Sequence, residues 1–384
     1  MNEVKKLVGE ALSEIISSAK SGGPKVKVGL MASGSELGAE ELAKGARIAV
    51  NHHRNVIPVM IGPKISGYDD LEWIETAECD ADIAENLEAA LKDGRIQGAV
   101  ALHFPFPLGV TTIGRVLTPG RGKDMIIAST TGTSATQRGE AMLRNAVYGI
   151  ATAKALGNLS PTLGILNVDT AQPVFRALQR MKERGYDINF GASVRKDGGA
   201  LLRGNDILVG AVDICVTDTL TGNIMMKMLS SFTTGGSYES TGSGYGPGIG
   251  ENYNRLVLIL SRASGAPVVA NAIRFAAQLA KGDVIKSARA GIANAKKAGL
   301  DEIIASLRKP VSIAEEIKVP EKEIVTEEIS GIDIMSLEDA AKELWKAQIY
   351  AESGMGCTGP VVLVSPGKFE KAVDILKKAG YIAE

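Results

Sequence analysis

The stretch ILVGAVDICVTDTLTGNI, residues 207–224, decides the fold of this chain. Its apolar run at 212–216 has the length of a buried strand. The run ends in Thr217 and Asp218, and small and polar residues then open a helical pattern. In open α/β sheets, ligands bind where strands end at their carboxyl side and helices begin. The stretch therefore predicts a parallel sheet with a ligand site at this turn.

The polar residues of this turn are the first candidates for chemistry. Asp218 could position a reacting group or accept a proton, while Thr221 and Asn223 could supply hydrogen bonds. The competing interpretation is an ordinary helix N-cap, made by Asp218 or Thr219. The sequence alone leaves both interpretations open.

Outward from this turn, apolar runs alternate with helical patterns, which is typical of βαβ units and a parallel sheet. Strands are predicted at 25–31, 55–62, 98–102, 125–129, 163–168, 187–194 and 361–364. Helices are predicted at about 36–51, 82–91, 135–155, 172–183, 266–281, 284–298, 337–350 and 368–379, and residues 1–20 also show helical spacing. Ser33 and Glu36 have the spacing of a capping box.

The length of the chain, 384 residues, exceeds the roughly 250–300 residues that a single core supports. We predict two Rossmann-like α/β domains with parallel-rich sheets and a cleft between them. The first covers residues 1–157, and the second, with the Asp218 turn, covers 158–318. Residues 319–384 are predicted to be a linker and a C-terminal segment that packs back on the first domain or forms a small third unit.

The composition excludes several classes of function. The net charge is −1 and aromatic residues make up 4% of the chain, so neither a basic stripe nor stacking platforms for nucleic acid are expected. The longest apolar runs are too short to span a bilayer. Three cysteines lie far apart without a CxxC pair, which indicates a cytoplasmic protein without a disulfide framework.

The sequence also lacks the motifs of common cofactor sites. The chain has neither a GxxxxGK[ST] sequence nor a glycine turn suited to a dinucleotide. The neighbours His52 and His53 point about 100° apart on a helix and cannot easily share a metal. His103 is interpreted as structural, and the alternatives left open are a base role for His103 and a Cys–His pair that uses His103 or His52. We expect no metal and no organic cofactor. The loop at 235–250, rich in Gly, Ser and Thr, is either a mobile lid or an ordinary surface loop.

A second hydroxyl-rich turn lies at 129–134, between a predicted strand and a predicted helix. Hydroxyls and free N–H groups at the start of a helix suit phosphate, and Arg138 nearby favours an anion. The candidate phosphate-binding residues are Ser129, Thr130, Thr131 and Gly132. Ser134 and Gln137 have capping-box spacing, so capping without a ligand is the alternative.

The segment GMGCTGP near the C-terminus places one thiol, that of Cys357, among small residues. Small neighbours leave a sulfur atom open to another molecule. Backbone N–H groups around Gly356 and Thr358 could lower the pKa of the thiol and stabilise the oxyanion of a thioester. The alternative for Cys357 is a buried cysteine in a tight turn, and Cys79 and Cys215 are interpreted as such structural cysteines.

Several of these segments resemble known families. The stretch 207–224, PTLGILNVDT at 161–170 and INFGASV at 188–194 resemble the phosphate acyltransferases of fatty acid and phospholipid synthesis and, more distantly, the phosphate acetyltransferases. GLMASGSELGAEELAKGARIAV at 29–50 and the GMGCTGP segment are similar to the alpha subunits of component C of the glycine/sarcosine/betaine reductase complex. Where the lipid-synthesis enzymes carry an acidic residue further along the helix, this chain has MLSS at 228–231.

The resemblance implies a function and a set of site residues. It implies that Cys357 carries an acetyl thioester, which inorganic phosphate cleaves to acetyl phosphate. It places Asp218 and Asn223 in the cleft motif of the acyltransferases. Further contacts to substrate or phosphate are expected at Thr217, Thr221 and Gly222.

The same resemblance implies partners, namely the beta subunit of component C and selenoprotein component A, and an oligomer. Two alternatives stay open at this point. One is an acyl-carrier-protein:phosphate acyltransferase that transfers without a covalent enzyme thiol. The other is a non-catalytic subunit that only docks the selenoprotein or the beta partner.

Overall fold

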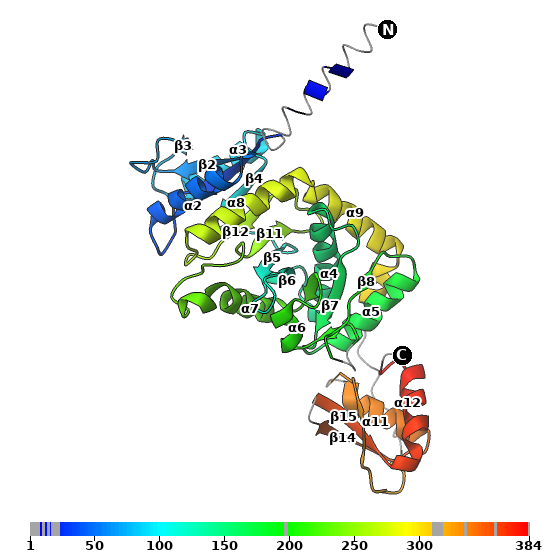
Figure 1. The fold of residues 1–384 in the computed structure, drawn as a ribbon. Coiled ribbons are helices and arrows are strands. Elements are labelled where there is room, and N and C mark those ends of the chain that lie inside the picture. The colour runs from blue at the N-terminus through cyan, green and yellow to red at the C-terminus, as the bar shows by residue number, and fades with distance from the viewer. Residues whose placement is uncertain are drawn as a thin grey trace.

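The computed structural model describes residues 24–195, 199–308, 318–333, 336–356 and 359–382, together with residues 8, 9, 12, 13 and 16. Most of the predicted N-terminal helix lies outside these residues. The described chain forms a large sheet with helices on both faces and a smaller unit at its C-terminal end (Figure 1). Since most of its strand pairs are parallel, the predicted α/β fold class is confirmed.

The large sheet has twelve strands in the order β3-β2-β1-β4-β12-β11-β5-β6-β10-β7-β8, and β9 pairs with β7. The pairs β11–β12, β11–β5 and β5–β6 are antiparallel. The strands are β1 Val26–Met31, β2 Val56–Gly62, β3 Glu72–Glu75, β4 Gly98–Ala101, β5 Thr111–Leu117, β6 Asp124–Gly132, β7 Thr162–Leu166, β8 Asn189–Phe190, β9 Leu201–Leu202, β10 Ile214–Val216, β11 Gly246–Ile249 and β12 Val257–Ile259.

Helices cover both faces of this sheet. They are α2 Ala39–His52, α3 Asp80–Lys92, α4 Arg138–Ala155, α5 Ala171–Glu183, α6 Gly204–Val209, α7 Thr219–Ser231, α8 Ala266–Lys281, α9 Val284–Lys297 and α10 Leu300–Arg308. Along β6, Ile126 and Ala128 belong to the core shared with α2, α4, α5, α8 and α9. Met125 and Ile127 belong to the cluster that contains α6 and α7. Because side chains alternate along a strand, these two groups of helices lie on opposite faces.

The chain forms these helices where the apolar residues recur at helical spacing. Helix α5 buries Val174, Phe175, Leu178 and Met181, which fall on one face of a 3.6-residue repeat. Helix α8 carries a Pro in its first turn and is followed by Gly282, so its start and end are marked locally. The structure confirms the predicted helix at 266–281.

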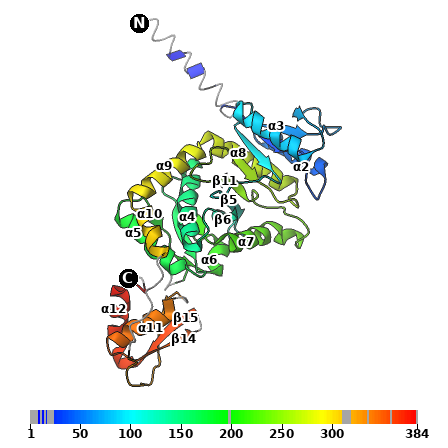
Figure 2. The ribbon, with the colours of Figure 1, turned by 180° about the vertical axis from the view of Figure 1, so that it is seen from behind.

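Residues 327–378 build a separate small unit with its own core. Its antiparallel sheet has the order β13-β15-β14, with bounds β13 Glu327–Ser330, β14 Ala351–Gly356 and β15 Gly359–Val364, and its helices are α11 Leu337–Lys346 and α12 Phe369–Lys378. Asp333 Oδ2 accepts a hydrogen bond of 2.8 Å from Thr170 N, and Arg176 Nη1 donates one of 3.4 Å to Tyr381 O. The unit thus contacts α5 and the residue before it, and both views place it beside that end of the body (Figures 1 and 2).

The structure corrects several element boundaries. Helix α2 begins at Ala39, so the predicted capping box of Ser33 and Glu36 is wrong, and Ser33 Oγ instead donates to Asp80 Oδ1 at 3.0 Å. Strand β6 continues to Gly132 because it pairs with β5, which the sequence did not predict.

Further corrections concern predicted loops. Part of the loop at 235–250 is β11, and part of the predicted linker at 319–332 is β13. Each of these short strands exists through pairing with a distant strand, so neither has a strong local pattern.

The predicted boundary at residue 157 falls between paired strands. Strand β6, before residue 157, is hydrogen-bonded along β10, which follows it, with Ile127 opposite Cys215. Strands β11 and β12 return after residue 245 to the centre of the sheet between β4 and β5. The division into two domains with a cleft stays a prediction.

Candidate functional site

The candidate site is built around the N-terminus of α7, where β10 ends. Asp218 is the N-cap of this helix, and its Oδ1 accepts a hydrogen bond of 3.1 Å from the backbone N–H of Thr221. The Thr221 hydroxyl donates to Asp218 Oδ2 at 2.6 Å. The helix-cap interpretation of Asp218 is therefore confirmed, and Thr221 belongs to the cap.

Arg138, at the start of α4, reaches this cap from the opposite side of β6. Its Nη2 lies 3.0 Å from Asp218 Oδ2, and its Nη1 lies 3.6 Å from Asp169 Oδ2. Burial raises the pKa of the Asp218 carboxyl, but the Thr221 hydroxyl and N–H and the Arg138 guanidinium outweigh that effect and lower the pKa overall. Asp218 is thus a stable carboxylate that orients neighbours, and it is too weak a base to remove a proton efficiently near neutral pH.

Gly222 fixes how closely α7 approaches β6. A Cβ atom at this position would lie 1.8 Å from the carbonyl oxygen of Ser129 and 3.2 Å from Ile127 Cγ2. Only glycine permits this contact. The predicted ligand contact of Gly222 stays a prediction, and the structure gives the residue a packing role.

A cluster of hydroxyls joins β5 to β6 directly below this helix. Thr111 Oγ1 donates to Ser129 Oγ at 2.6 Å, and Thr112 Oγ1 lies 2.7 Å from Thr130 Oγ1 and 2.9 Å from Thr131 Oγ1. Ser129 and Thr130 are fully buried. Their hydroxyls therefore hold the end of β6 in place.

Thr131 and Gly132 lie at the accessible end of the strand, where Thr131 is half-buried and Gly132 is exposed. These two residues keep the better access for an anion, although phosphate binding at any of the four turn residues stays a prediction. Helix α4 begins at Arg138 with Gln137 as its N-cap, so the predicted capping box of Ser134 and Gln137 is wrong. Ser134 Oγ instead donates to Asn145 Oδ1 at 2.7 Å.

Asn223 connects α7 to β6. Its Nδ2 donates to the carbonyl oxygen of Thr130 at 3.1 Å. Thr130 Oγ1 donates to the Tyr245 carbonyl oxygen at 2.7 Å. Thr217 Oγ1 is buried and has no hydrogen-bond partner among the described residues.

Sequence reasoning missed the threonines of β5 and Tyr245. Thr111 and Thr112 are two adjacent hydroxyl residues at the start of β5, TTIGRVL, where the register with β6 is irregular. The pair of hydroxyls in the sequence could have flagged them. Tyr245 carries no local signal, because its partners come from residues 112–130 and from α7.

Cys357 and Thr358 lie outside the described residues, between β14, which ends at Gly356, and β15, which begins at Gly359. Cys215 is buried, as predicted, and burial raises the pKa of its thiol to about 12. Cys79 is exposed at the residue before α3, so its predicted burial is wrong. Its immediate neighbours, Glu78 and Asp80, are acidic. The buried side of α3 is formed by later residues, among them Ile83 and Leu87.

No group of three or more His, Cys, Asp or Glu residues is placed to hold a metal ion in the described part. Among the described helices, none has both the length and the apolar character that a membrane span requires.

Comparisons with known proteins point to one superfamily. The family described as "Fatty acid synthesis protein" matches residues 26–363. The chain is 54% identical over 388 aligned residues to the glycine/sarcosine/betaine reductase complex component C subunit alpha of Peptoclostridium acidaminophilum, and the alignment covers 100% of both chains. It is 26% identical over 238 residues to the phosphate acyltransferase of Thermotoga petrophila, covering 53% of this chain and 68% of that relative.

Among solved structures, the chain is similar to a branched-chain phosphotransacylase from Enterococcus faecalis. The two share 17% identity with a TM-score of 0.46, and the match covers 66% of this chain and 99% of the other.

Proposed function

Since this chain belongs to the family of fatty acid synthesis proteins, we propose that it is an acyltransferase with phosphate as acceptor, acting as the alpha subunit of component C in a glycine/sarcosine/betaine-type reductase complex. The observation that carries the proposal is the 54% identity over the full length of a component C alpha subunit. Similarity to phosphate acyltransferases supports the acyl-transfer chemistry. Its partners are then a component C beta subunit and a selenoprotein that delivers the acyl group, in an oligomeric cytoplasmic assembly.

The proposed reaction is transfer of an acetyl group from the Cys357 thiol to inorganic phosphate. An oxygen of phosphate attacks the thioester carbonyl carbon, the carbon–sulfur bond breaks, and the electron pair leaves with the sulfur as thiolate. Acetyl phosphate and the free enzyme thiolate are the products. Because phosphate already carries negative charge, the step needs no base to activate it and no metal or organic cofactor.

Residues at three places along the chain have supporting roles in this reaction. Asp218, held as a carboxylate by Thr221 and Arg138, fixes the N-terminus of α7. N–H groups around Gly356 and Thr358 stabilise the oxyanion that forms as phosphate attacks. Thr131 and Gly132 mark where phosphate approaches the end of β6.

The test compares the three cysteines in the full-length chain with its beta subunit. Cys357→Ala should abolish acyl phosphate formation, while Cys79→Ala and Cys215→Ala should retain it. Incubation with acetyl phosphate should add one acetyl group to the peptide that contains Cys357, as seen by mass spectrometry. Full activity in Cys357→Ala would refute the covalent step.

One alternative has specific support. Similarity to a phosphate acyltransferase supports transfer of an acyl group to phosphate. In this alternative the donor is an acyl-carrier protein, and no enzyme thiol takes part. That enzyme would form acyl phosphate from acylated carrier protein with Cys357 replaced by alanine, and its cysteines would stay unmodified.

A further inference from the structure

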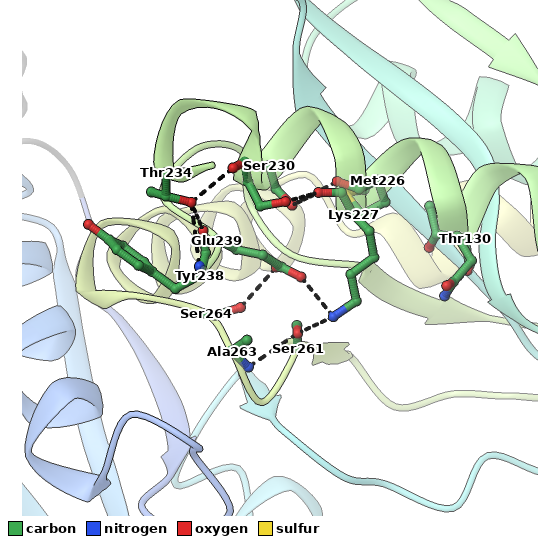
Figure 3. Close-up of polar contacts among 12 residues, drawn as sticks. Thr130, Met226, Lys227, Ser230, Thr234, Tyr238, Glu239, Ser261, Ala263 and Ser264 are labelled. Atoms are coloured by element: carbon green, nitrogen blue, oxygen red, sulfur yellow. Dashed lines mark hydrogen bonds and ion pairs between the residues drawn. The ribbon is translucent and has the colours of Figure 1, made fainter. Parts of the chain in front are cut away.

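Lys227 lies on α7, nine residues after Asp218, and takes no part in the acyl-transfer step proposed above. Its Nζ donates a hydrogen bond of 2.6 Å to Ser261 Oγ and lies 3.1 Å from Glu239 Oε1 (Figure 3). Its ammonium group also lies over the ring of Tyr245, at 5.8 Å from the ring centre. Three groups from separate segments thus converge on one cation.

The carboxylate of this group is unusually buried. Glu239 is 2% exposed, and its Oε2 accepts a hydrogen bond of 3.2 Å from Ser264 Oγ. Its backbone is fixed as well, since Glu239 N donates to Ala263 O and Gly265 N donates to Glu239 O. A buried carboxylate is costly unless a cation compensates it, and Lys227 is the cation within ion-pair distance among the described residues.

Lys227 also connects elements at the carboxyl ends of two parallel strand pairs, β4 with β12 and β6 with β10. Ser261 follows β12, which runs parallel to β4. Helix α7 packs on β6, which runs parallel to β10. The ammonium group therefore lies between the end of β12 and the helix that begins at the end of β10.

A chain of contacts connects Lys227 to the hydroxyl-rich end of β6. The Lys227 ammonium group lies 5.8 Å from the centre of the Tyr245 ring, and the Tyr245 carbonyl oxygen accepts a hydrogen bond of 2.7 Å from Thr130 Oγ1. While Glu239 is buried, the Lys227 side chain is 46% exposed. The buried Glu239 carboxylate thus holds the Lys227 ammonium group, which stays accessible to a ligand in solution.

We propose that the Lys227 ammonium group, oriented by Glu239 and Ser261, binds the phosphate that enters the acyl-transfer reaction. The inference rests on the proposed function for the identity of the anion. An ammonium group has three donor hydrogens, so it can bond Ser261 and face Glu239 while it donates to a phosphate oxygen. Glu239 is a positioning residue, which acts through Lys227.

The first experiment measures how inorganic phosphate binds and reacts in Lys227→Met, Lys227→Arg and a matched control. The control is Lys123→Met, because Lys123 Nζ pairs with Asp213 Oδ1 at 3.0 Å with similar exposure, 40%, and the pair lies at the amino ends of β6 and β10. Lys227→Met should raise the KM and Kd for phosphate about tenfold to a hundredfold, the effect of one charged hydrogen bond. Lys227→Arg should recover much of the affinity, and Lys123→Met should leave it unchanged.

The second experiment uses the pH profile of phosphate binding in Glu239→Gln. Burial lowers the pKa of Lys227, but Glu239 and Tyr245 raise it by more, so the net direction is upward. Binding requires the protonated ammonium and is lost as pH rises through that pKa. Glu239→Gln removes the larger of the two favourable interactions, so the alkaline limb should move to lower pH. A merely structural role for Glu239 would lower stability without moving this limb.

The outcomes separate this inference from the proposed function. If the wild type forms acyl phosphate and Lys227→Met binds phosphate as well as Lys123→Met does, the inference is refuted while the proposed function stands. If the wild type shows no acyl transfer but phosphate binding, followed by ³¹P NMR, still depends on Lys227, the inference stands without that reaction. If circular dichroism shows that Lys227→Met has lost its fold, Lys227→Gln and the Glu239→Gln pH profile decide the question.

Discussion

Replacing Gly222 with alanine should separate α7 from β6 and damage both stability and activity. The added Cβ would lie 1.8 Å from the Ser129 carbonyl oxygen, whereas real Cβ contacts are essentially never shorter than 3.0 Å. The two backbones must therefore move apart by about 1 Å, since a carbonyl oxygen cannot rotate away as a side chain can. Forcing an extra carbon into such a contact costs about 3 kcal/mol of unfolding free energy.

The assay is urea unfolding followed by circular dichroism, with Gly204→Ala as the control. Gly204 also lies in a helix, but a Cβ there would meet no atom within 4 Å. With a slope of about 3 kcal/mol per molar urea, Gly222→Ala should lower the unfolding midpoint by about 1 M. Gly204→Ala should change stability by less than about 1 kcal/mol, in the stabilising direction.

The same substitution also tests the site. Asn223 moves with α7, so its 3.1 Å hydrogen bond to the Thr130 carbonyl oxygen should break. Acyl phosphate formation should fall together with stability. Equal midpoints for Gly222→Ala and Gly204→Ala would refute the close approach and with it the geometry of the site.

Three further predictions follow from single contacts. Asp218→Ala should lower stability by about 1 kcal/mol at pH 7. Because the folded pKa of Asp218 lies below its unfolded value, this contribution is present above the unfolded pKa and should vanish in unfolding curves as pH falls through the folded pKa. A maleimide should label Cys79 in the native protein and Cys215 only after unfolding, and native labelling of Cys215 would contradict its burial. Asp333→Ala should speed hydrogen exchange at the Thr170 amide, whose partner is Asp333 Oδ2, and unchanged exchange would show that this contact does not hold the C-terminal unit.

The sequence predicted those parts of the fold that local patterns encode. Helix α8 was correct at both ends, because its apolar face and the glycines at 265 and 282 are local signals. The Asp218 cap was one of two stated interpretations, and cap chemistry is equally local. Strand β11, GPGI, was missed, since glycine and proline disfavour strands and only its pairing with β5 and β12 makes it one.

The site depends on contacts between residues that are far apart in sequence, and no local sequence pattern predicts such contacts. Tyr245 lies more than one hundred residues from Thr130 in sequence and 2.7 Å from it in space, measured from its carbonyl oxygen to the Thr130 hydroxyl. Such contacts depend on the order of strands in the sheet, which periodicity does not determine. The acyl-carrying role of Cys357 came from resemblance and stays a prediction.

Helix α7 carries Lys227 but no acidic residue, and the carboxylate that pairs with Lys227 comes from another segment. The residues that follow Lys227 on this helix, MLSS at 228–231, include no carboxylate. Here a carboxylate reaches α7 from a loop, because the backbone of Glu239 is held by residues 263 and 265 before α8. An acidic residue on α7 would belong to the same helix as Lys227. Glu239 instead pairs Lys227 with the segment before α8, to which the Glu239 backbone is hydrogen-bonded. The ion pair between Glu239 and Lys227 therefore connects α7 to the segment that leads into α8.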